Sequence, residues 1–217
     1  MHSPLLDKQW ALFDDAKYDQ AFDRTQAVLE RLPPADRRAA WRLMGMARYA
    51  GGSYEQAVDW FQELCQGSDV ADDWCRLALA AAMARQAKVA AAAFEQVRFC
   101  HQASRYSQHP SLYVHIYWYA SIRCDLRQYA AVGSLLNELA RAFRRVHQTD
   151  SVVLLSRGLP FLSSVLTVAV QCFSAEENYA TGIVWLEALA KGLDEPGQRQ
   201  VAGALRELME EDEGVNT

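Results

Sequence analysis

Apolar residues recur with helical spacing along most of the 217-residue chain. One stretch suggests a β-strand instead, because in "HIYWYASIRCD", His115–Asp125, alternate positions are aromatic or β-branched. A strand here has no obvious partner elsewhere in the sequence. Its assignment therefore depends on the pattern of the whole chain.

An internal repeat provides that pattern. Segments 41–64 and 74–97 align without a gap, at spacings that suit two helices joined by a short turn. In the first copy the turn is "GGS", where glycines can end one helix and Ser53 can cap the next. The corresponding positions are Trp41, Met44, Gly45, Ala57, Phe61 and Leu64 in the first copy, and Trp74, Leu77, Ala78, Ala90, Phe94 and Val97 in the second.

Three further copies fit the same template, starting at Leu5, Ile116 and Leu166. The copy that starts at Ile116 includes the alternating stretch His115–Asp125, which is therefore predicted to be a helix. The successive starts at 5, 41, 74, 116 and 166 predict five helix pairs, with longer helices or loops in the last two intervals. The apolar positions of these copies are Tyr18, Ala21 and Val28, then Tyr119, Ala120, Val132, Leu136 and Leu139, then Ala169, Val170, Tyr179, Gly182, Leu186 and Leu189.

The pattern resembles the tetratricopeptide repeat (TPR), whose signature of W, L-G, Y, A, F and P is most closely met between Trp41 and Leu64. Arg48 departs from it by occupying the family's aromatic position, with Tyr49 one place later. The resemblance covers most of residues 4 to 190. It implies an all-α fold, a TPR-like helical-repeat superhelix (α-solenoid) of about five helix pairs with a C-terminal capping helix.

We accordingly expect one repeat domain over residues 1–206. Its repeats lie near 4–33, 37–68, 71–106, 111–147 and 151–191, and the cap starts at 196. Beyond Pro196, apolar residues at Val201, Leu205 and Leu208 oppose a charged face, as a terminal capping helix requires. We expect residues 207–217 to form a solvated acidic tail.

The TPR resemblance also implies a binding surface. In that family the face of each first helix that the core does not use lines a concave groove for a partner's peptide, and it lies one, five and eight residues after each start. The strongest expected partner-binding residues are Trp10, Phe13, Arg42, Met46, Tyr49, Leu79, Tyr117, Ser121 and Cys124. The remaining groove positions are Leu6, Cys75, Ala82, Thr167, Gln171 and Ser174. The alternative is that other parts of the chain cover this face.

Charge, apolar runs and cysteine spacing argue against several classes of protein. The net charge of −5 matches five acids near the C-terminus, and the nearly neutral remainder argues against a general nucleic-acid binder. The N-terminus lacks the features of a signal peptide and no apolar run is suited to span a bilayer, so we expect a cytoplasmic protein without membrane insertion. Five cysteines without a CxxC pair suit buried thiols, and the neighbouring Cys100 and His101 match no metal-ligand spacing.

No catalytic motif is present, and paired acids such as Asp72 and Asp73 lie near predicted helix ends, where solvated capping is their usual role. We expect a non-catalytic adaptor, scaffold or chaperone that binds another protein or peptide segment and needs no cofactor or metal. A homo-oligomer is also possible. One alternative is a nucleic-acid-binding or regulatory repeat protein that uses an arginine cluster. Another is an all-helical enzyme whose site the sequence does not reveal. The arginine cluster comprises Arg123, Arg127, Arg141, Arg144 and Arg145.

Overall fold

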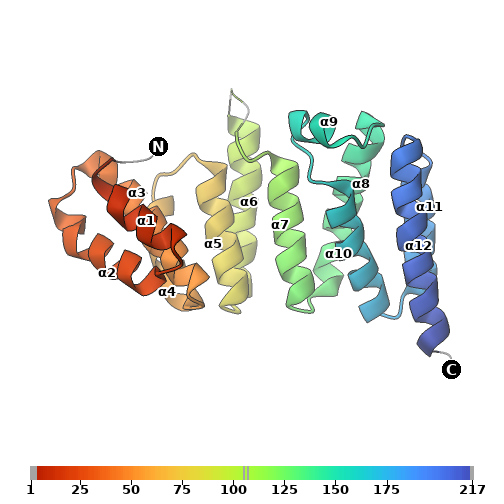
Figure 1. Ribbon diagram of the computed structural model, residues 1–217, viewed down its shortest axis with the longest axis horizontal. Coiled ribbons are helices and arrows are strands. Elements are labelled where there is room, and N and C mark those ends of the chain that lie inside the picture. Colours follow the sequence, from red (N-terminus) through yellow and green to blue (C-terminus); the bar gives the residue numbers. More distant parts are fainter. Residues whose placement is uncertain (1–3, 105, 107, 216–217) are drawn as a thin grey trace. The chain divides into compact units, whose positions relative to one another are not determined.

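The computed structural model describes residues 4–104, 106 and 108–215. Within these residues the protein contains twelve α-helices, three short 3-10 helices and no strand, which confirms the all-α prediction (Figure 1). The helices are α1 (Asp7–Asp14), α2 (Tyr18–Val28), α3 (Pro34–Ala50), α4 (Tyr54–Cys65), α5 (Ala71–Met83), α6 (Ala87–Ala103), α7 (Leu112–Asp125), α8 (Val132–Val146), α9 (Ser151–Ser156), α10 (Leu162–Ala175), α11 (Tyr179–Ala190) and α12 (Glu195–Val215).

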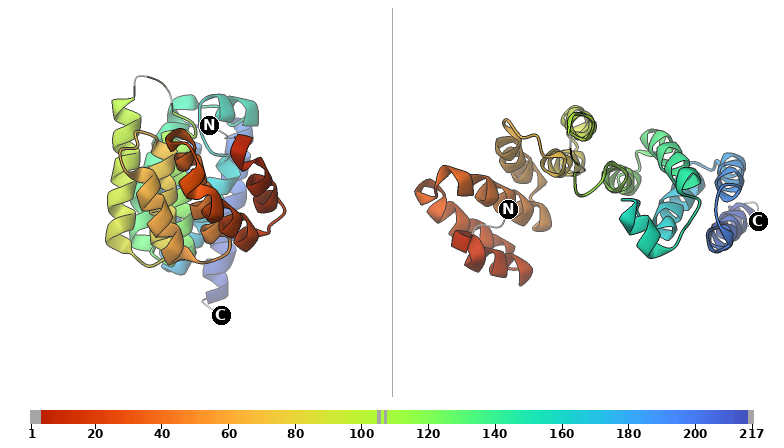
Figure 2. Two further views of the ribbon diagram at one scale, coloured as in Figure 1. Left: turned by 90° about the vertical axis from the view of Figure 1, so that its left-hand side faces the viewer. Right: turned by 90° about the horizontal axis from the view of Figure 1, so that it is seen from above.

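The chain forms two compact units, residues 1–109 and 110–217, where the sequence suggested one domain over 1–206. In the first unit each helix from α1 to α6 packs against the next. Figure 2, right, looks along α5 and α6 and shows them side by side. In the second unit α7 packs against α8, α10 contacts both of them, and α12 covers α10 and α11.

The strand-like stretch is helical, as predicted, and belongs to α7. Its N-cap is Ser111, whose hydroxyl accepts a hydrogen bond from the backbone N–H of Val114 at 3.3 Å. Ile116, Tyr119 and Ala120 are buried, so the helix has the core face that the repeat alignment assigned to it.

The aligned apolar positions are buried in most copies, with informative exceptions. Trp41 and Trp74 are only partly buried, and the Trp74 indole N–H donates to the Ser68 carbonyl at 2.9 Å. Leu5 is exposed while Leu6 is fully buried, so the expected core position at the start of the first copy is wrong. Residues 4–6 form a 3-10 helix before α1, and its tighter winding turns Leu6 inward.

Six helix-to-helix turns of the described residues share one geometry. Each contains a residue with positive φ, and the same three hydrogen bonds surround it: the preceding N–H reaches four residues back, its own N–H three, and the following N–H five. This is the Schellman arrangement that ends helices. Five of the positive-φ residues lie eleven positions after the five predicted repeat starts, and they are Ala16, Gly52, Arg85, Arg127 and Glu177. The sixth, Gly158, follows α9 and corresponds to no predicted start.

The two long intervals contain additional chain, as expected. The segment between α6 and α7 lengthens one of them, and α9 lengthens the other. We did not predict α9, whose N-cap Asp150 accepts from the N–H groups of Val152 and Val153. Val152 and Leu155 of this short helix are exposed, and Leu154 is the side chain that it buries in the core.

Helix α12 covers the end of the second unit. Val201 and Leu208 are fully buried, and Leu208 lies so close to Gly182 of α11 that a side chain there would meet it. The helix continues to Val215, so the acidic residues from Glu207 onward form its last turns and not a separate tail. No helix within the described ranges is long and apolar enough to cross a membrane.

Candidate functional site

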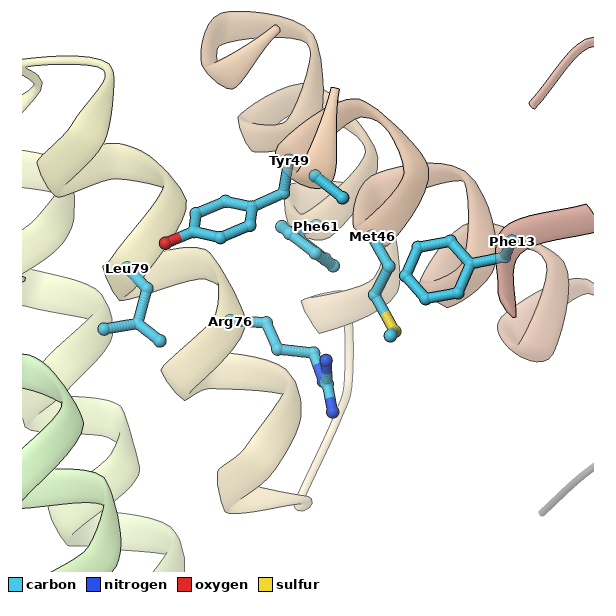
Figure 3. Close-up of a pocket in the computed structure, with 7 residues that line it drawn as sticks. Phe13, Met46, Tyr49, Phe61, Arg76 and Leu79 are labelled. Atoms are coloured by element: carbon cyan, nitrogen blue, oxygen red, sulfur yellow. The ribbon is translucent and has the colours of Figure 1, made fainter. Parts of the chain in front are cut away.

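A small apolar pocket opens between α1, α3, α4 and α5 of the first unit (Figure 3). Its volume is about 130 Å³. It brings together Phe13, Met46, Tyr49 and Leu79, which the sequence analysis assigned to the partner-binding groove. We call it the α3–α5 pocket; its lining is Phe13, Met46, Tyr49, Ala50, Phe61, Arg76 and Leu79.

The floor of the α3–α5 pocket depends on a close helix contact. A side chain added at Gly45 would bring its Cβ within 2.5 Å of the Phe61 ring, so only glycine lets that ring lie against α3. Phe61 is almost fully buried and exposes only part of its ring to the pocket. We had assigned Phe61 to the core alone, and the structure shows that it also forms part of the pocket.

Aromatic contacts hold the pocket walls. The Tyr49 ring packs edge-on against Tyr54 at 5.4 Å between centroids, and Phe13 lies 5.4 Å from Tyr18. Figure 3 shows the Phe13 ring beside Met46 and the Tyr49 ring directed toward Leu79. Each of these ring pairs packs a pocket-lining ring against a second aromatic ring outside the lining.

One charged side chain reaches the pocket. Arg76 of α5 donates from Nε to the Asp72 carboxylate at 3.0 Å and remains 30% exposed, while Asp72 is 16% exposed. Sequence analysis missed Arg76, because its position on α5 lies outside the stripe expected from the family. The pocket therefore combines an apolar interior with one guanidinium group.

Next to the pocket lies a buried ion-pair cluster centred on Asp73. This fully buried carboxylate accepts from Arg42 Nη2 at 2.5 Å, from Arg38 Nη2 at 3.1 Å and from the Ser68 hydroxyl at 2.9 Å. The expectation that Asp73 caps a helix in solvent is wrong. Both arginines come from α3, and a buried carboxylate requires such paired and hydrogen-bonded surroundings.

The remaining groove residues do not gather at the pocket. Trp10 packs against the core cluster around Leu6. Tyr117 and Ser121 are partly buried on α7, in the second unit. Cys124 is a correction: it is fully buried, and its thiol lies 3.8 Å from the Val168 carbonyl of α10.

Three further groove positions are corrected in the same way. Leu6, Cys75 and Ala82 are buried in the core, so their side chains offer no surface to a partner. Thr167 and Gln171 are exposed on α10.

All five cysteines are free and buried. Burial raises the pKa of the Cys65 thiol to about 12, of Cys124 to about 11 and of Cys172 to about 12. Burial also raises the pKa values of Cys75 and Cys100. Thiols with raised pKa values are poor nucleophiles. No three metal-ligating side chains cluster among the described residues.

The basic end of α8 has a structural role at one residue. His147 ends the helix with positive φ, its Nδ1 lies 2.8 Å from the Gly192 carbonyl oxygen, and its own carbonyl accepts from the N–H of Asp194. These contacts tie α8 to the loop before α12. Arg141 and Arg145 are exposed on the same helix.

Comparison with known proteins finds no matching family, no matching curated protein and no matching solved structure.

Proposed function

We propose that this chain is a non-catalytic protein-interaction module of the TPR type, which holds a segment of another protein at the α3–α5 pocket. The observation that carries the proposal is the meeting of Phe13, Met46, Tyr49 and Leu79 in one apolar pocket. These residues come from the first helices of three successive pairs, at the offsets by which TPR proteins line their groove.

The five turns that follow the repeat starts at a constant offset of eleven residues support a repeat architecture of this kind. A recurrent hydrogen-bond pattern at a constant offset is expected when each helix pair repeats one unit. The departure at Arg48 is also accommodated, because its guanidinium carbon lies 3.6 Å from the Phe22 ring centroid and its Nη1 donates to Asp19 at 2.8 Å. Stacked in this way, an arginine can replace an aromatic residue at a helix contact.

The pocket chemistry favours binding over catalysis. Its described lining residues include no carboxylate, imidazole or thiol, and the one hydroxyl group among them is the Tyr49 phenol, so the commonest general bases and nucleophiles are missing from the lining. Apolar pockets with aromatic walls are typical anchor sites for a partner's side chain.

Filling the pocket tests the proposal. The probe is a library of random peptides displayed on phage and selected on the immobilised full chain. Ala50→Leu places a larger side chain at the exposed pocket edge, while Ala91→Leu makes the same change at an exposed position of α6 outside the pocket lining. We expect the selected peptides to bind the Ala91→Leu variant as they bind the wild type, and Ala50→Leu to weaken their binding about tenfold or more.

Peptides that bind both variants equally would place the interaction elsewhere, and failure to select any peptide would contradict the proposal. Tyr117→Ala examines the second unit: an equal loss of affinity would show that α7 also contributes. Thermal melts of each variant separate weakened binding from lost stability.

A further inference from the structure

We infer that the partner segment carries one bulky apolar side chain and, about one helical turn away, an acidic side chain that pairs with the arginines beside the pocket. This inference rests on the proposed function and specifies its ligand. The size of the pocket, the exposure of the neighbouring charges and their spacing along α3 each support part of it.

The volume admits a single side chain. An engineered apolar cavity of about 150 Å³ holds one benzene molecule. At about 130 Å³, the α3–α5 pocket is similar in size and suits one leucine, isoleucine, methionine or phenylalanine side chain. Two adjacent anchors would not fit.

The surface beside the pocket presents positive charge. Among the described residues, the ion pairs of Arg38, Arg42 and Arg76 involve two carboxylates, those of Asp72 and Asp73. The acids are the more deeply buried partners, at 16% and 0% exposure, whereas the arginines remain 37%, 22% and 30% exposed. A docking segment therefore meets guanidinium groups first, and a carboxylate is the group that complements them bidentately.

The acid is expected on a side chain of the segment. In the ion pairs of the described residues the three arginines share the charges of two acids, so this cluster has one more positive than negative charge, which a ligand carboxylate would complement. Capture of a chain-terminal carboxylate typically uses a nest of backbone N–H groups, whereas the cations here are arginine side chains. A single remaining charge suits one aspartate or glutamate within a continuing chain.

The spacing follows from α3. Arg42 precedes Met46 by four residues on one face of this helix, which separates them by about 6 Å along its axis. An extended ligand covers about that distance in two residues, and a helical ligand in three or four. The acid should therefore lie two, three or four positions from the apolar anchor.

Selection with charge variants tests this inference. Each displayed random peptide is followed by further chain of the phage coat protein and preceded by a fixed segment, so none has a free terminal carboxylate. The peptides are selected separately on the full-length wild type, on Arg76→Gln and on Arg199→Gln. Arg199→Gln is a matched control, because Arg199 also pairs with an acid four residues earlier, Glu195, but lies on α12 of the second unit. Denaturant melts check that each variant is folded.

We expect wild-type and Arg199→Gln selections to enrich a bulky apolar residue with Asp or Glu two to four positions away. Selection on Arg76→Gln should keep the apolar residue and lose the acid. For a synthetic, amidated wild-type peptide, Arg76→Gln and replacement of the peptide's acid by its amide should each weaken binding about five- to tenfold, and the two losses should not add.

The outcomes distinguish the two proposals. Apolar peptides without an acid, or an acid preference unchanged by Arg76→Gln, overturn the charge assignment and leave the proposed function standing. Tighter binding of peptides with a free C-terminus than of amidated ones overturns the side-chain assignment. Peptides that bind independently of Ala50→Leu overturn both proposals.

Discussion

Gly52→Ala and Gly203→Ala make the same chemical change and should shift stability in opposite directions. Gly52 occupies the α3–α4 turn at φ +79°, whereas Gly203 lies inside α12. A Cβ built at either position meets no atom within 4 Å. Packing therefore does not differ between the two substitutions, and backbone conformation alone should determine the result.

The expected magnitudes follow from that conformation. An alanine in the left-handed region costs about 1–2 kcal/mol, offset by about 0.4–1 kcal/mol because alanine restricts the unfolded chain. Gly52→Ala should therefore lower the free energy of unfolding by about 0.5–1 kcal/mol. Gly203→Ala should raise it by about 0.5–1 kcal/mol, because alanine is the better helix former.

Ala16→Gly provides the reverse change within the first unit. Ala16 occupies the equivalent turn between α1 and α2 at φ +58° and is exposed. Its replacement should stabilise the unit by about the amount that Gly52→Ala removes. Denaturant unfolding followed by far-UV circular dichroism measures all three. If Gly52→Ala is neutral or stabilising, the shared left-handed turn is not the conformation in solution.

Three further predictions concern buried groups. Asp73→Asn should cost about 3–5 kcal/mol in denaturant unfolding, because two arginines lose a buried partner, whereas Glu195→Gln, in an exposed pair, should cost less than about 1 kcal/mol. The free energy of unfolding should fall as the pH rises from about 9 toward 11: the folded state keeps the Cys65, Cys124 and Cys172 thiols protonated, with pKa values of about 12, 11 and 12, while the unfolded chain releases their protons near pH 9. A pH-independent value across this range would contradict their burial. Leu208→Ala should cost about 2–5 kcal/mol in a denaturant melt, and a loss below 1 kcal/mol would mean that α12 does not cover α10 and α11 as the structure shows.

Apolar periodicity predicted the helices well where each helix has one dominant buried face. The alignment of segments 41–64 and 74–97 placed α3 to α6 correctly, and it assigned α7 although that stretch alternates like a strand. It failed for α9, whose six residues are too few to show a helical period, and at Leu5, which lies in a 3-10 turn that exposes it and buries Leu6.

The site was less predictable because it depends on contacts between distant residues. The prediction that groove residues lie one, five and eight positions after each repeat start found Met46 and Tyr49, which line the pocket. It failed at Cys124, which α10 covers. The pairing of Asp73 with Arg42, thirty-one residues away, has no local signature, since an acid at a helix start ordinarily indicates a cap.

The Asp73 cluster connects stability to the proposed binding function. Arg42 and Asp73 join α3 to α5, the two helices that supply Met46, Tyr49, Arg76 and Leu79 to the pocket. The cluster therefore fixes the separation of the two pocket walls. It also holds the Arg42 guanidinium in place before a ligand arrives, which reduces the side-chain entropy lost on binding. A buried ion pair contributes little net stability compared with apolar packing of the same volume, so its position beside the pocket is better explained by preorganisation of the site than by folding alone.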